Sequence, residues 1–458
     1  ENHFPETADA DPELLARHCT EAGLAQQAVG YWHVAGQRAL ARSAMAESVT
    51  QLTHALELLA GLPAERDRDR QELDLLIDLG RALIASKGWA APEVAETYER
   101  ARELCSMEAE HPQLLAALSG LQAHHLHRSG AGVGVRCAEE LLRAAKRQRN
   151  ANVLAAGHQV LGLSLLFNGQ LLPAQAHVER ALALYDPADR ASVEDLARAD
   201  IRVAGLGFSS LILLWRGYPD RAVVCSEEAL AAARELGDAF TTSQALYLTC
   251  WLHQVRGASR IVGHHADAMM ALATEHGLSA WSASAAIFHG WAVADSGAIE
   301  RGIAQMQQGL SAQQALGVQQ HIPGLLGLLA GTHLKQGDPV EALKLVDDAL
   351  TRVDRLDERW FEAELHRLRG EALLVLDGEF PAEAELAIRN AIEIARRQGA
   401  KWWELRAAAT LTRHGAQQDD RSQARDCLAQ VYGWFTEGFD TLNLREAKAL
   451  RPDIHSAQ

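Results

Sequence analysis

The feature that most constrains the fold of this chain is the regular placement of small side chains, at a step of about 40 residues. The first column of this pattern is Ser210, Cys250, Gly290, Ala330 and Gly370. A second column keeps the same step at Gly217, Gly257, Gly297 and Gly337, and continues at Asp377 and Gly378. A third column is Gly237, Gly277 and Gly317, continued by Asp357 and Gly399. Three columns in register indicate a chain built by repeating one structural unit.

Each unit is predicted to be a pair of antiparallel helices. Gly and Asp tolerate the left-handed backbone conformation that commonly follows a helix, so the second and third columns mark two helix ends per unit. The small column falls in mid-helix, where a bulky side chain would keep neighbouring helices apart. Start signals for the second helix are Pro219 with Asp220 and Asp338 with Pro339. Apolar residues then recur at helical spacing, as in Ala342, Leu345, Val346, Ala349 and Leu350.

The same pattern extends toward the amino terminus, with pairs centred near Gly130, Gly88 and Gly23. Residues 26–42 are expected to serve as the second helix of one pair and the first of the next. Residues 61–70 and 185–194 are expected to be loops, both too short for a domain linker. We therefore predict an all-α fold, one continuous right-handed α-solenoid of about ten or eleven hairpins over residues 1–458. Within it, residues 1–60 form amino-terminal hairpins joined to an upstream module, 61–430 the main repeats and 431–458 a cap.

Composition and charge narrow the class of protein. The chain has 458 residues, of which 48% are hydrophobic, so it has enough apolar surface to fold. Against 44 Lys and Arg stand 60 Asp and Glu, a net charge of −16. The longest basic stretch, 143–149, is typical of a solvated helix face. Because phosphate binding needs clustered Lys and Arg, direct binding to nucleic acid is not expected.

The cysteines and the apolar stretches indicate a cytoplasmic protein. Six cysteines are scattered without a CxxC pair, as expected of small core residues in a reducing compartment. No signal peptide and no uninterrupted apolar span is visible, so no membrane association is expected.

The repeats resemble the MalT-type tetratricopeptide regions of bacterial signal-transduction ATPases. More narrowly, the chain is similar to the carboxy-terminal half of large ATPases that carry an adenylate or guanylate cyclase module. The stretches that carry the resemblance are 12–22, 87–94, 362–371 and 432–440, the last reading YGWFTEGFD. The resemblance implies an ATPase module, with or without a cyclase, upstream of Glu1 in the parent protein. It also implies a regulatory role in signal transduction.

Sequence signals for catalysis are lacking in this chain. It contains no Gly-rich phosphate loop, no recognisable pair of metal-binding cyclase aspartates and no GxSxG nucleophile elbow. The carboxylates Asp347 and Asp348 are expected to be solvated. We therefore expect no enzyme activity and no cofactor in this chain, and no helix-turn-helix tail is recognised after Leu450.

Candidate binding residues follow from the helical register. In a hairpin solenoid, positions one, four and five after the small column, and three before it, are expected to face the concave groove. The residues selected are Phe167, Trp215, Tyr247, Trp251, Gln254, Trp291, Asp295, Lys335, Arg367 and Glu371. Tryptophans in a groove can anchor a peptide or a small molecule. The alternative is that these aromatic residues pack between repeats.

A histidine cluster is a second candidate. His124 and His127 share a helix face beside Arg128. They suit an anionic ligand better than a metal, because no carboxylate or cysteine stands at ligand spacing. Ordinary packing is the alternative.

Three functions stay open. The first is a binding or sensor arm of a signalling ATPase or cyclase-like protein, recognising a protein, a peptide or a small effector in its groove. The second is the effector-binding arm of a MalT- or LuxR-type transcription activator. The third is a scaffold for self-association into a homo-oligomer.

Overall fold

The computed structural model describes residues 11–42, 44–63, 66–105, 113–193, 196, 199–377, 381–414 and 418–450. Every regular element within these ranges is a helix, which confirms the all-α prediction. The chain divides into two compact units, and we describe each by itself. Unit 1 comprises residues 1–128 with 316–318, and unit 2 comprises 129–315 and 319–458. That both belong to one continuous solenoid stays a prediction.

Unit 1 is a series of helices that pack each on the next along the chain. They are α2 (Pro12–Glu21), α3 (Ala25–Ala41), α4 (Met45–Ala60), α5 (Arg66–Lys87), α6 (Pro92–Cys105) and α7 (Leu114–Arg128). Helix α3 contacts both α2 and α4, so the predicted sharing of one helix between two hairpins is confirmed. The loop predicted at 61–70 is shorter than expected, because α5 already begins at Arg66.

Unit 2 contains the regular repeats. The first helix of each successive hairpin is α9 (Ala151–Phe167), α11 (Ile201–Trp215), α13 (Ala239–Val255), α15 (Ser279–Asp295), α17 (Ile322–Gln336), α19 (Glu362–Asp377) and α21 (Lys401–His414). The second helices are α10 (Leu171–Leu184), α12 (Pro219–Leu236), α14 (Ser259–Glu275), α16 (Ile299–Ala315), α18 (Pro339–Leu356), α20 (Ala382–Gln398) and α22 (Gln418–Tyr432). Helix α8 (Ala131–Ala145) precedes the series, α23 (Leu442–Ala449) ends it, and a short 3-10 helix, η1 (Pro187–Val193), lies in the predicted loop 185–194. None of the described helices is both long and apolar enough to cross a bilayer.

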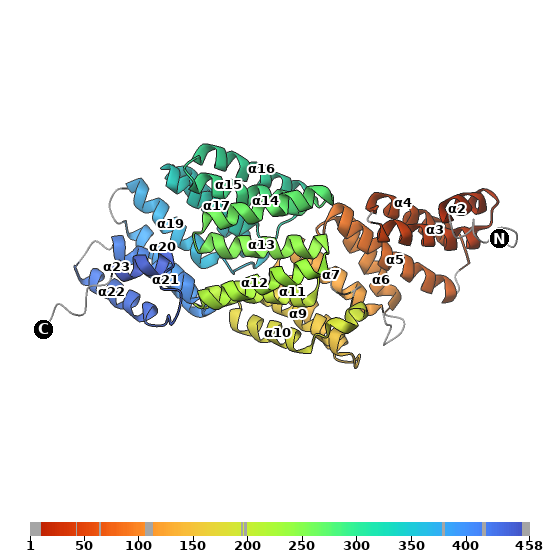
Figure 1. The fold of residues 1–458 in the computed structure, drawn as a ribbon, viewed down its shortest axis with the longest axis horizontal. Coiled ribbons are helices and arrows are strands. Elements are labelled where there is room, and N and C mark those ends of the chain that lie inside the picture. The colour runs from red at the N-terminus through yellow and green to blue at the C-terminus, as the bar shows by residue number, and fades with distance from the viewer. Residues whose placement is uncertain are drawn as a thin grey trace. The chain divides into compact units, whose positions relative to one another are not determined.

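The layering of unit 2 follows from which helices touch. Each first helix packs on its own second helix, and the first helices also pack on one another in order from α9 to α21. They therefore form the inner layer of the unit, while the second helices lie outside (Figure 1). Side chains of the inner layer come together from many repeats, so this is the layer in which a binding site is expected.

The turn columns predicted from the sequence are confirmed. Gly217, Gly257, Gly297 and Gly337 all have positive φ. So do the residues of the other turn column, including Asp357 at φ +51° and Gly399 at +70°. Gly378 lies outside the described residues. Asp338 caps α18 as expected, its Oδ1 accepting a hydrogen bond from Glu341 N at 3.0 Å.

The small column lies where the two helices of a hairpin come closest. A Cβ on Gly290 would stand 2.7 Å from the carbonyl oxygen of Gly302 on the partner helix. A Cβ on Gly370 would stand 2.4 Å from a side-chain carbon of Ile388. Ser210, Cys250 and Ala330 are fully buried. A residue larger than these would push the two helices of its hairpin apart.

Replacing Gly290 by Ala should therefore destabilise the protein by about 1–3 kcal/mol, because backbone atoms of α16 must give way. Gly263→Ala is the matched control, since its Cβ meets only the Ala292 Cβ at 3.5 Å and Ala is the better helix former. Free energies of unfolding from urea titrations measure both. Equal stability of the two variants would contradict the proposed close contact.

The end of unit 2 is tied to its second hairpin, α11 and α12, by a segment we call the strap, residues 434–441. Glu437 Oε1 accepts hydrogen bonds from the backbone amides of Asp220 (2.9 Å) and Arg221 (3.0 Å), in the first turn of α12. Arg221 also pairs with Glu437 Oε2 at 3.0 Å. In return, Asp220 Oδ2 accepts from Gly438 N at 2.9 Å. Helix α12 has no side-chain cap of its own at Tyr218, so Glu437 caps it from across the sequence.

Helix α11 also packs directly on α21, so contact between the second and the last hairpin of the series does not depend on the strap alone. The indole of Trp434 donates to the carbonyl of Arg216 at 3.2 Å. Gly438 has φ +74°, and a Cβ there would overlap Pro219. Helix α23 follows the strap directly and packs on α21 and α22, as Figure 1 shows. The strap thus fixes where α23 begins.

Glu437→Ala should lower stability by about 1 kcal/mol, within the range of a lost helix cap, and should speed amide hydrogen exchange at the start of α12. Asp440→Ala, an exposed carboxylate of the same strap, is the control. Hydrogen-exchange mass spectrometry of the α12 peptides measures this exchange in both variants. Unchanged exchange there in Glu437→Ala would show that the cap is not formed.

Candidate binding site on the inner face of unit 2

Four of the predicted groove residues lie in one buried aromatic cluster. Phe167, Trp215, Tyr247 and Trp251 are between 0% and 4% exposed. Trp360, which precedes α19, joins them: its ring lies 5.0 Å from Trp215, 5.0 Å from Trp251 and 6.2 Å from Phe167. Tyr247 and Phe167 also meet at His321, at 5.4 and 4.7 Å. These side chains join the inner helices to one another, so their role in ligand binding stays a prediction.

A carboxylate is buried inside this aromatic cluster. Glu358 is 2% exposed. Its Oε1 accepts hydrogen bonds from the backbone amide of His321 (2.9 Å) and from the Trp360 indole (2.7 Å). Burial raises the pKa of Glu358 to about 7, although both hydrogen bonds favour the charged form.

The sign of the resulting pH dependence follows from linkage. Unfolded Glu358 loses its proton near its ordinary pKa of 4.5, whereas folded Glu358 keeps it until about 7. The stability that it contributes is therefore fully present below pH 4.5 and falls, by up to about 3 kcal/mol, as pH rises toward 7. Glu358→Gln keeps the oxygen that accepts both bonds and cannot titrate. We expect the stability of the native chain, relative to Glu358→Gln, to fall between pH 4.5 and 7.5 in urea titrations, and a constant difference would contradict this.

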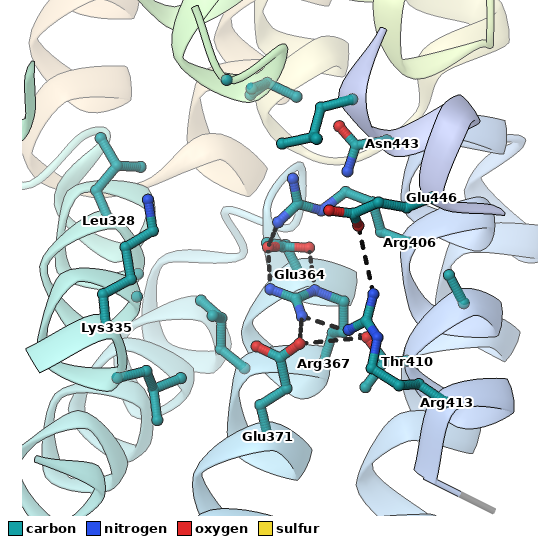
Figure 2. Close-up of a pocket in the computed structure, with 18 of the residues that line it drawn as sticks. Leu328, Lys335, Glu364, Arg367, Glu371, Arg406, Thr410, Arg413, Asn443 and Glu446 are labelled. Atoms are coloured by element: carbon teal, nitrogen blue, oxygen red, sulfur yellow. Dashed lines mark hydrogen bonds and ion pairs between the residues drawn. The ribbon is translucent and has the colours of Figure 1, made fainter. Parts of the chain in front are cut away.

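Five of the other six predicted groove residues line a cavity of about 470 Å³, and the sixth, Asp295, is not among the residues that line it. Gln254 of α13, Trp291 of α15, Lys335 of α17, and Arg367 and Glu371 of α19 all border it. Helices α21 and α23 complete the wall (Figure 2). The volume lies within the usual range of ligand pockets. The register rule thus brings together residues from four repeats.

Charged side chains on α19 and α21 form a connected network along one wall. Arg367, 5% exposed, pairs with both oxygens of Glu364 at 2.7 and 2.8 Å and with Glu371. Burial alone would lower the pKa of Arg367, but the two carboxylates raise it above its ordinary value. Arg406 donates to Glu364 at 2.8 Å. This wall is held in place by paired charges, and Figure 2 shows them pointing toward one another.

Two more ion pairs border the pocket. Arg413 of α21 reaches Glu446 of α23 at 3.3 Å, with both side chains more than 40% exposed. On the opposite side, Lys335 donates to Asp295 at 2.6 Å and its ammonium lies 5.9 Å from the ring centre of Trp291. Gly331 of α17 also lines the pocket, and a Cβ there would touch only Leu368, at 3.7 Å.

The predicted histidine cluster lies in unit 1 and packs against the turn between α5 and α6. His124 Nδ1 lies 3.1 Å from the carbonyl of Trp89, and the His127 ring stacks on the Trp89 ring at 5.5 Å. Arg128 donates to the carbonyl of Ala90 at 3.3 Å. Burial lowers the pKa of His124, and that of His127 to about 4, so both are neutral at pH 7. They add no positive charge for an anion, and anion binding there stays a prediction.

The register rule missed the residues of α21 and α23. Continuing the small column by one more step from Gly370 leads to Thr410, which lines the pocket, so the signal for α21 is present. Arg406 and Arg413 stand one position outside those the rule selects. Asn443 and Glu446 lie beyond the last repeat, and no periodicity announces them. Trp360 and Trp403 lie before the mid-helix column, where the rule does not look.

The chemistry of the site is that of polar recognition. Its guanidinium, ammonium, carboxylate and amide groups surround an open space with apolar surface from Trp291 and Leu328. Within the described part of the chain, no three His, Cys, Asp or Glu side chains gather as metal ligands.

Comparison by sequence finds similarity to a longer protein at low identity. No protein-family model matches the chain. The uncharacterized protein R02095 of Rhizobium meliloti is 27% identical over 399 residues, which is 85% of this chain and 38% of that protein. The chain thus spans well under half the length of this relative.

Solved structures are similar in fold. The Rap conjugation gene regulator of plasmid pLS20, in complex with the Phr* peptide, matches with a TM-score of 0.52 and 14% identity, over 73% of this chain and 97% of that one. A Rap protein complexed with competence and sporulation factor matches at 0.42, with 11% identity over 92% and 95% of the two chains. A tetratricopeptide repeat protein from Parabacteroides merdae matches at 0.33, with 14% identity over 73% and 99%. Together with the repeated hairpins of unit 2, the likeness to the Rap conjugation gene regulator gives the chain a tetratricopeptide-like helical-repeat fold.

Proposed function

We propose that unit 2 is a non-catalytic binding module that holds a peptide segment of a partner in the inner-face pocket. The observation that carries this proposal is the wall formed by Glu364, Arg367, Glu371 and Arg406, where charges are held in fixed positions beside an open space. Preorganised polar groups reduce the ordering cost of binding. A site of this kind orients a polar ligand, while Trp291 and Leu328 offer it apolar contact.

The size of the pocket and the fold both favour a peptide. About 470 Å³ accommodates a few side chains rather than a whole protein surface. The Rap regulator that is similar in fold is itself in complex with a peptide. Within the pocket lining, Gln254 also has a buried side-chain oxygen that makes no hydrogen bond within the described residues, which a peptide amide can satisfy.

We further propose that the chain is the regulatory arm of a larger cytoplasmic signalling protein in bacteria. The resemblance to ATPase- and cyclase-linked repeat regions supports this, as does the greater length of the Rhizobium relative. In this proposal, ligand occupancy is passed in cis to an ATPase or cyclase module. The alternatives, an arm of a transcription activator and a self-association scaffold, predict a DNA-binding module in the same gene and a concentration-dependent mass, respectively.

A pocket-filling substitution tests the site. Gly331→Leu adds a side chain to the pocket lining at a position where a Cβ contacts only the side chain of Leu368. Retention of a random hexapeptide library on the immobilised full chain is measured by mass spectrometry. We expect Gly331→Leu to lower retention at least about tenfold, a loss of about 1.4 kcal/mol in binding free energy.

Gly30→Leu is the matched control, because a Cβ at this exposed helix position of unit 1 meets nothing within 4 Å. It should retain peptides like the native chain. Equal retention by all three proteins, or none by the native chain, would contradict the proposed function.

A further inference from the structure

The pocket wall carries one positive charge more than it can balance by itself. Among the described lining residues, α19 and α21 contribute the guanidinium groups of Arg367, Arg406 and Arg413, against two carboxylates, Glu364 and Glu371. Lys335 is already matched by Asp295. The third carboxylate, Glu446, comes from α23, a helix outside the repeat pattern. It pairs with Arg413 (Figure 2).

The ion pair between Arg413 and Glu446 is weak enough for a ligand carboxylate to replace Glu446. The two side chains are 41% and 45% exposed and their atoms lie 3.3 Å apart, so the pair is screened by solvent and contributes little to stability. The backbone of α23 is anchored by Leu444 and Ala447, which are fully buried. The Glu446 side chain can therefore turn away while its helix stays in place.

Arg406 has hydrogen-bonding capacity to spare on the same wall. One of its terminal nitrogens donates to Glu364, which also accepts a hydrogen bond from Arg367. Its Nε is buried and has no hydrogen-bond partner within the described residues. A buried donor without a partner is costly, and a ligand acceptor would satisfy it.

We infer, on the basis of the proposed function, that the bound peptide is acidic. It presents a carboxylate to Arg413 and Arg406, in the position that the Glu446 carboxylate occupies in this structure. An incoming carboxylate exchanges one anion for another, so the wall stays balanced. A neutral or cationic group that displaced Glu446 would leave a guanidinium unpaired in a partly desolvated site. Because the chain as a whole carries −16, an acidic ligand is disfavoured over most of the surface and gains a cationic partner here only by taking the place of Glu446.

Four hexapeptide libraries test this inference with the full chain. Two contain Asp and Glu and two omit them, and each kind is made with a free terminal carboxylate and as a terminal amide. Retention of the Asp- and Glu-containing amides would assign the carboxylate to a side chain. Retention only of free acids would assign it to the peptide terminus.

Two variants that are expected to change the retention of acidic peptides in opposite directions test the inference most directly. Arg413→Gln should lower the retention of acidic peptides about tenfold, because a charge-assisted pair is lost. Glu446→Gln should raise it several-fold, since the internal competitor is removed. Arg425→Gln and Asp426→Asn, exposed charge changes on α22 of the same signs, are the controls and should change neither. Circular dichroism melting of all four verifies folding.

The outcomes separate the two proposals. Retention of peptides without preference for a carboxylate, lost in Gly331→Leu but unchanged in Arg413→Gln and Glu446→Gln, would overturn the acidic ligand and leave the binding function standing. Absence of retained peptide from every library would overturn both. Equal gains from Glu446→Gln and Asp426→Asn would reduce the effect to overall charge and also overturn the inference.

Discussion

The close approach of the two helices within each hairpin is the contact on which the rest of unit 2 depends. Where Gly290 meets Gly302, and Gly370 meets Ile388, there is no room for another carbon atom. This contact sets how closely each first helix can lie on its second helix. The aromatic cluster around Trp360 and the pocket wall on α19 and α21 are built from side chains that several inner helices bring together.

The pocket of this acidic chain contains both arginine side chains in buried ion pairs and an arginine side chain in an exposed ion pair that a ligand can replace. Arg367 and Glu364 are nearly fully buried and hold one another in position. Arg413 and Glu446 are half exposed and hold one another loosely. Buried pairs are costly to break, whereas exposed pairs exchange readily with solvent and ions. The same wall therefore combines a rigid frame with a contact that a ligand can replace.

The sequence predicted the helices, the turn residues and five of the pocket residues, because each of these repeats with the hairpin. Gly217 and Asp357 fall where the period requires a left-handed residue, and Lys335 falls where the register requires an inward one. Contacts that do not repeat with the hairpin were not predicted. Glu437 capping α12 and Glu446 meeting Arg413 are contacts made once, between segments that only the folded unit brings together. Two of the predicted groove tryptophans, Trp215 and Trp251, lie buried against Trp360, a contact that a register cannot reveal.

The strap changes how unit 2 is expected to come apart. In an open row of repeats, each unit touches only its neighbours, so the terminal units fray and unfolding proceeds inward from either end. In unit 2 the last hairpins grip the start of α12 through Glu437 and the carbonyl of Arg216 through Trp434, and α21 packs on α11. The last hairpin cannot fray without first breaking its contacts with α11 and α12. The repeats from α11 onward should thus melt together as one cooperative body, instead of unfolding stepwise from the carboxyl end.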